Sequence, residues 1–437
     1  MAAPIDCCQN RNYSAAISEY NKIFRSDLKS LKELQEKAIT VLISGKDCIC
    51  SLPTGYGKSL IYELLPFIDH GCLVIVIAPL NAIIKQQVQK LCGMAMCFSG
   101  VNDISRLKSG EISYVFSHPE EILQSRELND AFTSDRLNTR KIYLVVDEAH
   151  CILQWGDEFR PEYRNLSNLR SVFKCQVLAL SATVTESGPK QIISNLLMKN
   201  CQIICASPAK DNIELIVKKR PSPNTKGNTA SSPYDFIFSH VITELNCQLD
   251  AFPLTVVYCK SMQWIRYGYE MARQLLADNF YAGDKTQQNA RVVMFHSSME
   301  KGSGQLKDMI ISSLQKADSC IRLIISSVAL GMGADLKYVR RVIHAGPPTT
   351  LETYVQEIGR SGRSDTSAQA ILYYNNNDLA AQHMRNEMKV YCRGERCYRE
   401  LINEYFGFKA VQKPSVCCNR CQPEHGLEWD FDKLSIA

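Results

Sequence analysis

The segment Leu52-Pro53-Thr54-Gly55-Tyr56-Gly57-Lys58-Ser59 lies between an apolar run, 47–52, and an apolar stretch of helical length, 59–68. Between a strand and a helix, such a glycine-containing turn binds phosphate through backbone N–H groups and the start of the helix. The strict form of this phosphate loop has glycine where this chain has Leu52. The alternative interpretation is a chance Gly-Lys-Ser turn. The context favours the phosphate loop, and with it an α/β nucleotide-binding fold.

The side chains of this segment match the needs of a bound nucleotide. Gly55 and Gly57 permit a close approach of the backbone, and Thr54 belongs to the same loop. Lys58 is expected to reach the β- and γ-phosphates of ATP, and the Ser59 hydroxyl to hold Mg²⁺. These five residues are therefore predicted to bind the nucleotide.

Apolar runs alternate with helical patterns along the whole chain, in two series. The predicted strands are 47–52, 72–78, 112–117, 142–147 and 176–181, followed by 254–259, 291–295, 321–326, 340–344 and 369–374. The predicted helices include 59–68, 81–91, 262–277 and 351–358. Unbroken apolar strands that alternate with helices indicate parallel sheets covered on both faces. We therefore expect an α/β fold with two tandem parallel-sheet domains.

Changes in composition indicate where these domains divide. Residues 220–233, RPSPNTKGNTASSP, show no apolar periodicity and are rich in proline and serine, which is typical of a loop. We predict a first domain over 1–209 and a second domain over 210–390 that contains this loop. A cysteine-rich module over 391–425 and a tail over 426–437 are predicted to follow.

Composition and charge exclude several classes of protein. Of 437 residues, 45% are hydrophobic and 22% charged, which excludes a mostly disordered chain. The formal net charge of +5 permits a nucleic-acid partner without arguing for one. The longest strongly apolar run, 72–78, is too short for a membrane span, and no secretory signal is visible. The 19 cysteines are therefore expected to be mostly free thiols in a reducing compartment.

A pair of acidic residues, Asp147 and Glu148, ends the apolar run 142–146. Open α/β sheets bind ligands at the carboxyl ends of their strands, where such carboxylates would meet a nucleotide. Asp147 is expected to hold Mg²⁺, and Glu148 to orient and deprotonate the attacking water. The alternative is a strand end capped by solvated acids. Together with the phosphate loop, the pair predicts ATP hydrolysis.

A segment in the second half, Gln356-Glu357-Ile358-Gly359-Arg360-Ser361-Gly362-Arg363, carries two arginines. They would share one face if the segment were helical, and arginine stabilises charge on a transferring γ-phosphoryl group. The alternative is an exposed salt-bridge face, but two glycines are unfavourable in a plain exposed helix. We predict that Arg360 and Arg363, with Gln356, belong to the catalytic residues of an enzyme whose two domains close around ATP.

Further motifs follow in order along the chain. They are 31–35, 78–80, 117–120, 154–163, 181–183, 258–261, 295–296 and 326–340. With the phosphate loop, the acids and the arginines, they make the chain from about residue 20 to 421 resemble the RecQ family of ATP-dependent DNA helicases in superfamily two. The resemblance implies two tandem RecA-like domains and a small helical, Cys-rich zinc-binding module. It also implies a short form without the winged-helix and C-terminal accessory domains of longer members.

The resemblance assigns roles to individual residues outside the phosphate loop. Gln35 is the expected adenine contact, beside Lys32, where the family usually has arginine. Asp335 is implied among the nucleotide-binding residues. Ser117 and His296 are implied among the residues that contact the DNA strand.

The most specific motif is 154–163, QWGDEFRPEY, which resembles the aromatic-rich loop of the family. Trp155 and Phe159 offer stacking faces for bases, and Arg160 offers a guanidinium group for phosphate or stacking. The alternative is an aromatic plug in the core. The family usually has histidine where this chain has Asp157, and an acid there is unfavourable beside a phosphate backbone. Weaker coupling of DNA binding to hydrolysis is therefore expected.

Five cysteines crowd the tail: Cys392, Cys397, Cys417, Cys418 and Cys421. The last two form a C-x₂-C pair, and an amphipathic helix is predicted over 398–408. This cluster resembles the family's zinc-binding module, in which Zn²⁺ takes four Cys or His ligands, and the last four cysteines are the predicted ligands. Cys417 is the unsettled one, because adjacent ligands strain a tetrahedral site; Cys392 and His425 are substitutes. The alternative is a degenerate site whose thiols pack as small hydrophobes. Asn419 stands where the family commonly has aspartate.

These observations together predict a DNA-stimulated ATPase that moves on single-stranded DNA and unwinds duplexes, with ATP, Mg²⁺ and Zn²⁺ as cofactors. The 3′→5′ direction of movement is implied by the resemblance alone. Single-stranded and forked DNA are the expected partners, without sequence preference and with no membrane, because stacking and phosphate contacts read no sequence. Two alternatives stay open: an ATPase or strand-annealing protein with little unwinding, and a catalytically silent nucleic-acid-binding scaffold. The aromatic-rich loop and the cysteines disfavour an RNA helicase. A nuclear location, and a part in DNA repair and recombination, are inferred from the activity alone.

Overall fold

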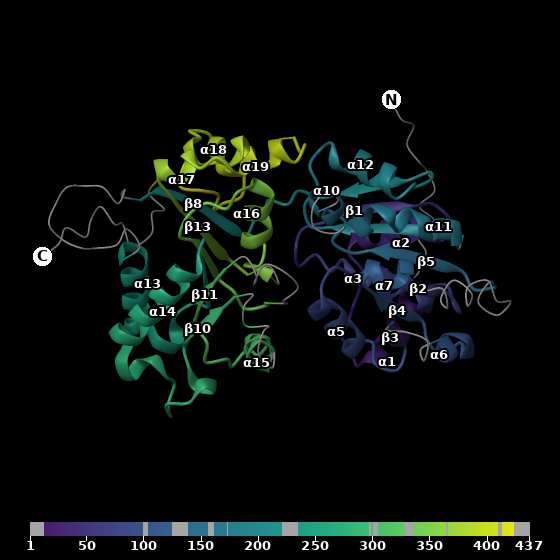
Figure 1. Ribbon diagram of the computed structural model, residues 1–437, viewed down its shortest axis with the longest axis horizontal. Coiled ribbons are helices and arrows are strands. Elements are labelled where there is room, and N and C mark those ends of the chain that lie inside the picture. Colours follow the sequence, from purple (N-terminus) through teal and green to yellow (C-terminus); the bar gives the residue numbers. More distant parts are fainter. Residues whose placement is uncertain are drawn as a thin grey trace, which may run out of the picture. The chain divides into compact units, whose positions relative to one another are not determined.

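The computed structural model of the chain describes most of its residues (Figure 1). The described residues are 13–98, 104–124, 139–155, 161–172, 174–220, 235–296, 299, 305–327, 336–363, 366–409 and 413–423. They form two compact units, one built largely from residues up to Ala206 and the other from Ser207 onward. In the described residues, no helix is long and apolar enough to cross a membrane.

The first unit is built on a parallel sheet of seven strands in the order β3-β4-β2-β5-β6-β1-β7. The strands are β1 (Cys48–Ser51), β2 (Leu73–Ile77), β3 (Ala95–Cys97), β4 (Tyr114–Ser117), β5 (Ile142–Val146), β6 (Cys175–Ser181) and β7 (Gln202–Cys205). Every pairing in it is parallel, which requires a crossover between successive strands. The helices supply these crossovers.

Alternate residues of each central strand face opposite sides of this sheet, and helices cover both sides. In β2, Leu73, Ile75 and Ile77 pack in one core, and Val74 and Val76 pack in the other. The first core is covered by α6 (Ile104–Ser109), α7 (Pro119–Gln124), α10 (Cys151–Trp155), η2 (Pro161–Asn168), α11 (Leu169–Val172) and α12 (Gly188–Asn195). The second is covered by α1 (Ser14–Phe24), α2 (Glu33–Ile43), α3 (Ser59–Glu63), α4 (Leu65–Ile68) and α5 (Asn81–Lys90).

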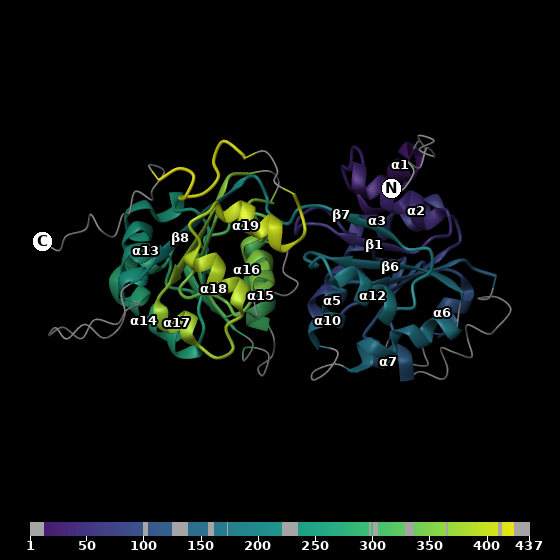
Figure 2. The same ribbon diagram turned by 90° about the horizontal axis from the view of Figure 1, so that it is seen from above.

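The second unit repeats this architecture with six parallel strands in the order β10-β11-β9-β12-β13-β8. They are β8 (Ile213–Lys219), β9 (Thr255–Tyr258), β10 (Val292–Phe295), β11 (Leu323–Ser326), β12 (Arg341–His344) and β13 (Ala368–Tyr374). One face is covered by α13 (Asp235–Gln248) and α14 (Met262–Leu276), which lie side by side (Figures 1 and 2). The short helices η3 (Leu249–Ala251), η4 (Ala277–Phe280) and η5 (Gln287–Asn289) follow them. The other face carries α15 (Gln305–Leu314), α16 (Leu351–Ile358), α17 (Asn376–Ala380), α18 (Asn386–Arg393) and α19 (Tyr398–Tyr405).

The two parallel-sheet, RecA-like domains confirm the predicted fold class, and the differences from the prediction are local. The helix predicted over 59–68 is divided at Leu64, since Pro66 has no N–H for the helical bond to the Tyr62 carbonyl. Strands β3, β7 and β8 are sheet edges that the prediction missed. Strand β7 has four residues, of which only Ile204 is buried.

The cysteine-rich segment covers the edge strand β8. The Leu215 N–H donates to the Cys417 carbonyl and the Asn419 N–H donates to the Leu215 carbonyl, both at 3.1 Å. The Asn419 side chain continues this pairing with Val217: its Oδ1 accepts from the Val217 N–H and its Nδ2 donates to the Val217 carbonyl, each at 3.2 Å. An edge strand needs such a cover, because its unpaired backbone groups would otherwise pair with another chain. The segment is thereby an integral part of the second unit.

Candidate nucleotide-binding site and cysteine cluster

The phosphate loop leaves the carboxyl end of β1 and leads into α3, as predicted. Gly55 and Gly57 have φ angles of +84° and +89°, a region that favours glycine. A Cβ atom at Gly57 would lie 2.7 Å from Nε2 of Gln35, so this position has no room for a side chain. Nζ of Lys58 donates to the Leu52 carbonyl at 3.0 Å, which folds the lysine back over the loop.

Gln35 connects helix α2 to this loop. Its side chain is buried, its Oε1 accepts from the Lys32 N–H at 2.8 Å, and its Nε2 donates to the carbonyls of Tyr56 and Gly57 at 3.1 and 2.9 Å. Nζ of Lys32 lies 4.8 Å from the centre of the Tyr56 ring, a cation–π distance. The predicted adenine contact of Gln35 stays a prediction.

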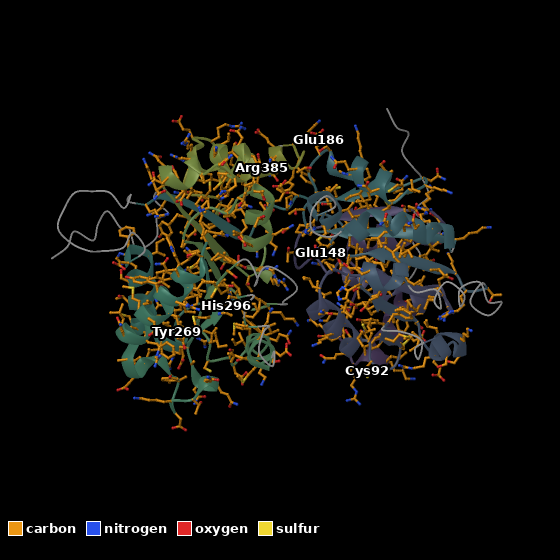
Figure 3. All side chains as sticks on the ribbon, in the orientation of Figure 1. Cys92, Glu148, Glu186, Tyr269, His296 and Arg385 are labelled. Carbon is orange, nitrogen blue, oxygen red and sulfur yellow. The ribbon has the colours of Figure 1, made fainter. Side chains whose placement is uncertain are left out.

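The two acids lie where β5 ends. Burial raises the pKa of Asp147 to about 7, and the charge of Glu148 adds to this rise while that of Lys58 opposes it. The Glu148 N–H donates to Oδ1 of Asp147 at 3.0 Å. Glu148, labelled in Figure 3, has a φ of +50°, which costs energy in a residue other than glycine and is typical of functional loops. The carboxylates thus share a partly buried, strained turn at the carboxyl edge of the sheet.

His150 is a residue to which the sequence assigned no role. Its Nδ1 lies 3.3 Å from Oε2 of Glu148 and 3.2 Å from Oγ of Ser181. Ser181 ends β6, and its hydroxyl donates to the Thr183 carbonyl at 3.0 Å. His150 therefore joins the acidic turn to the segment 181–183. Only the three-dimensional pairing of β5 with β6 reveals this connection, since the two segments are distant in the chain.

The arginine segment in the second unit is not helical. Helix α16 ends at Ile358, and Gly362 has a φ of +61°, which a helix does not contain. The helix thus has the predicted bounds, 351–358, and Arg360 and Arg363 do not share a helical face. Arg360 is buried, with 7% of its surface exposed, and Arg363 is half-buried.

A buried polar pair, His344 and Glu357, lies at the end of α16, just before these arginines in the chain. Nε2 of His344 and Oε2 of Glu357 are 2.7 Å apart, and both side chains are at most 3% exposed. The His344 ring stacks on Tyr258, whose pKa burial raises and the charge of Arg360 lowers. Gln356 is half-buried on α16. The pair anchors the end of α16 to strand β12, directly before the arginines.

The predicted strand-contacting residues differ in how far the structure describes them. Ser117 is fully buried and donates to the His118 carbonyl at 3.0 Å, so its hydroxyl is already used. His296, labelled in Figure 3, is half-buried after β10, and burial, followed by the charges of Arg266 and Lys307, lowers its pKa. Trp155 is the last residue of α10. The side chain of Trp155 and the residues Asp157, Phe159, Arg160, Asp335 and His425 lie outside the described part of the chain.

Four cysteine sulfur atoms of the second unit converge. Those of Cys397, Cys417, Cys418 and Cys421 lie within 4.8 Å of one another. The Sγ of Cys397 is 3.6 Å from that of Cys417 and 3.9 Å from that of Cys418. Two adjacent cysteines therefore point into one cluster, in spite of the expected strain. A turn in which the Cys421 N–H donates to the Cys418 carbonyl at 3.0 Å brings Cys421 into the same cluster.

The remaining tail cysteine, Cys392, is buried but is not one of this group. The acidities of the clustered thiols differ. Burial raises the pKa of Cys417 to about 11 and that of Cys421 to about 12. Burial also disfavours the thiolate of Cys418, but backbone N–H groups, first that of Cys421, outweigh this and lower the pKa of Cys418. Cys418 is thus the thiol best prepared to be a thiolate.

Comparisons with known proteins agree with this geometry. Residues 32–192 match the DEAD/DEAH box helicase family, and residues 240–365 match the helicase conserved C-terminal domain. A solved structure of the DUF1998 helicase MrfA bound to DNA has the same fold, with a TM-score of 0.67 at 16% identity, over 90% of this chain and 52% of that one. The fold and the matched domains define a protein of the two-domain helicase class.

Curated relatives narrow this class to one family. The chain is 25% identical to the ATP-dependent DNA helicase RecQ of Haemophilus influenzae, over 93% of this chain and 63% of that protein. It is 30% identical to the probable ATP-dependent DNA helicase RecS of Bacillus subtilis, over 82% of this chain and 67% of that protein. The chain belongs to the RecQ family of helicases. It spans less than two thirds of the length of the Haemophilus relative.

Proposed function

We propose that this chain is an ATP-dependent DNA helicase that couples ATP hydrolysis to 3′→5′ movement on single-stranded DNA and to duplex unwinding. The observation that carries the proposal is the joint presence of Lys58, Asp147 and Glu148 at the carboxyl edge of one parallel sheet, where such folds bind ligands. The polarity and the preference for DNA rest on membership of the RecQ family.

The phosphate loop and a few further residues would hold the nucleotide. The backbone from Thr54 to Gly57 would bind the phosphates, and Lys58 would exchange its bond to the Leu52 carbonyl for one to the β- or γ-phosphate. Gln35 and Lys32, together with Asp335, would hold the rest of the nucleotide. Because Gln35 already binds two carbonyls of the phosphate loop, it would couple the binding of a base to the conformation of that loop.

The residues at this edge fit a bound Mg²⁺. The raised pKa of Asp147 shows that the positive charge of Lys58 alone does not offset the burial and the neighbouring Glu148. A carboxylate and a hydroxyl oxygen, those of Asp147 and Ser59, are donors that Mg²⁺ accepts. When bound, the cation supplies positive charge that neutralises the phosphate oxygens.

Hydrolysis would use the acidic turn and the arginine segment. Glu148 would orient the attacking water and take its proton, and His150, which contacts both Glu148 and Ser181, would hold the Glu148 carboxylate in place. Arg360 and Arg363 would stabilise the charge that spreads over the transferring phosphoryl group, and Gln356 would contribute beside them.

DNA would be held by stacking and by phosphate contacts. Trp155 and Phe159 would stack on bases and Arg160 would bind phosphate, with Ser117 and His296 as further contact positions. Because none of these contacts reads a base edge, single-stranded and forked DNA of any sequence would be bound. A nuclear location and a part in DNA repair and recombination would follow from this activity.

The cysteine cluster fits a structural Zn²⁺. Four sulfur ligands at about 2.3 Å from a tetrahedral zinc are about 3.8 Å from one another. The separations of 3.6 and 3.9 Å from Cys397 to Cys417 and Cys418 match this value. The four residues of the cluster would hold the metal, which would stabilise the cover over β8.

ATP hydrolysis with and without single-stranded DNA tests the proposal, beside the Lys58→Ala variant as a matched control. We expect DNA to stimulate hydrolysis and the variant to hydrolyse almost no ATP. Hydrolysis no faster than that of the variant would leave the silent scaffold as the function. A forked-duplex assay then distinguishes unwinding from an ATPase or annealing activity without unwinding. The acidic Asp157 in the aromatic-rich loop favours this second activity.

A further inference from the structure

The backbone that carries the two arginines is held by side chains from the start of the second unit. Nζ of Lys210 donates to the carbonyls of Gly359 and Ser361, at 2.7 and 3.1 Å. Nδ2 of Asn212 donates to the carbonyls of Gly362 and Thr366, at 2.8 and 2.6 Å. Two side chains thus bind four carbonyls along the segment 359–366, from a position about 150 residues earlier in the chain.

This segment depends on such contacts. The last carbonyls of a helix have no partner within it, and α16 ends one residue before Gly359. A cation at this end of a helix is favourable because the dipole there is negative, and the ammonium group of Lys210 supplies it. The close approach of Asn212 also requires glycine, since a Cβ atom at Gly362 would lie 2.7 Å from its Nδ2.

The backbone of Lys210 is in turn bound by Arg399, a residue that follows the cluster's Cys397 in the chain. Arg399 is 3% exposed and lies on α19, directly after Cys397 and Tyr398. Its Nη1 donates to the Lys210 carbonyl and its Nη2 donates to the Ile213 carbonyl at 2.7 Å. The Leu215 N–H, two residues after Ile213 on β8, donates to the carbonyl of Cys417, one of the four clustered cysteines, at 3.1 Å. Hydrogen bonds and one short stretch of β8 therefore connect the cluster to the backbone of the arginine segment, within one compact unit.

We propose that Lys210 and Asn212 are positioning residues for Arg360 and Arg363, and that Arg399 connects them to the cysteine cluster. Neither Lys210 nor Asn212 is assigned a contact with the nucleotide in this proposal. Each acts by fixing the carbonyls between which the arginines lie. The inference rests on the proposed function, because it assigns Arg360 and Arg363 to ATP hydrolysis.

Steady-state ATP hydrolysis with saturating single-stranded DNA tests this inference on the full-length chain. Lys210→Met keeps the length of the side chain and removes its donors. We expect kcat to fall by about tenfold while KM for ATP changes by less than about twofold, since an interaction made in the transition state is lost. Lys210→Arg keeps donors at this position and is expected to retain about half of kcat. Lys219→Met is the matched control and is expected to leave kcat unchanged, because Lys219 is exposed at the end of β8, the strand that follows Lys210.

A double-mutant comparison separates positioning from a general loss of structure. In the Arg363→Ala background, Lys210→Met is expected to lower kcat by less than about twofold, because the arginine that it positions is gone. An equal tenfold loss in both backgrounds would overturn the inference, as would an unchanged kcat in Lys210→Met alone. Should Lys210→Met not fold, Asn212→Ala is put through the same comparison, with the same outcomes. A wild-type chain without DNA-stimulated hydrolysis overturns the proposed function instead, and no result with these variants does so.

Discussion

Replacing Asn419 with aspartate changes one atom in the cover over β8 and should loosen that cover. The amide of Asn419 both accepts from and donates to the backbone of Val217, at 3.2 Å in each direction. A carboxylate only accepts, so in Asn419→Asp the Val217 carbonyl loses its donor and faces a negative charge. Loss of one such bond, with an acceptor left unsatisfied, costs about 1–3 kcal/mol.

Hydrogen exchange of the backbone amides measures this cost locally. The amides of Leu215 and Asn419 exchange when the cover opens, because they donate to the Cys417 and Leu215 carbonyls. A change of about 1–3 kcal/mol corresponds to roughly 5- to 150-fold faster exchange. We expect this increase at pH 7.5 for these two amides. Amides of the first unit serve as the internal control and should exchange as in the wild type.

The dependence on pH makes this prediction specific to the lost donor. A carboxyl group that faces a carbonyl has a raised pKa in the folded state, so its penalty should shrink as the pH falls and the proton restores a donor. Asn419→Ala also loses the bonds, but it has no titrating group at this position. The ratio of its amide exchange rates to those of the wild type should therefore stay constant between pH 7.5 and 5.5. Exchange in Asn419→Asp as slow as in the wild type would refute the reasoning, and so would the same pH dependence in both variants.

Three other predictions concern the cysteines and the buried acids. Metal analysis of the purified chain should give about one zinc per molecule; Cys417→Ser should lower this content while Cys392→Ser leaves it unchanged, and the opposite pattern would place the fourth ligand elsewhere. Asp47→Ala should lower the free energy of unfolding by about 3 kcal/mol, measured by denaturant titration, because Asp47 is buried and accepts from a guanidinium group and two backbone N–H groups. Burial disfavours the Asp69 carboxylate, but the Tyr143 hydroxyl, which donates to it at 2.6 Å, and the Lys141 ammonium outweigh this and lower its pKa. The Asp69 carboxylate therefore stabilises the fold at neutral pH, and this stabilisation is lost as the pH falls below the usual carboxyl range. The melting temperatures of the wild type and of Asp69→Asn should accordingly converge in acid.

Local patterns in the sequence were sufficient for most of the fold. Central strands such as β2 and β5 are buried on both faces, and a strand of this kind must be apolar throughout. The phosphate loop was equally readable, because its glycines, its lysine and its serine are consecutive and their positions follow from one turn. The edge strand β7 was not predicted, because it has only four residues and a single buried one, Ile204, so it lacks the long buried run of a central strand.

The candidate site shows the same division. Each predicted residue could be named because its chemistry is carried by a short motif, and several of those roles stay predictions. The role of His150 was not readable, since its partner Ser181 comes from another strand. The helix before the arginine segment was predicted to end at Ile358, where α16 ends, but the contacts that Lys210 makes with the segment could not be predicted, since they join distant parts of the chain.

The amino-acid sequence by itself determined the class of fold, the order of the motifs and membership of the RecQ family, because each of these depends on residues that are near one another in the chain. The tertiary structure decided which groups meet. It brought Cys417 and Cys418 into one cluster, and it placed Lys210 on the carbonyls of the arginine segment. Such contacts join residues about 20 to 150 positions apart, and they form only when the sheet and its cover have packed.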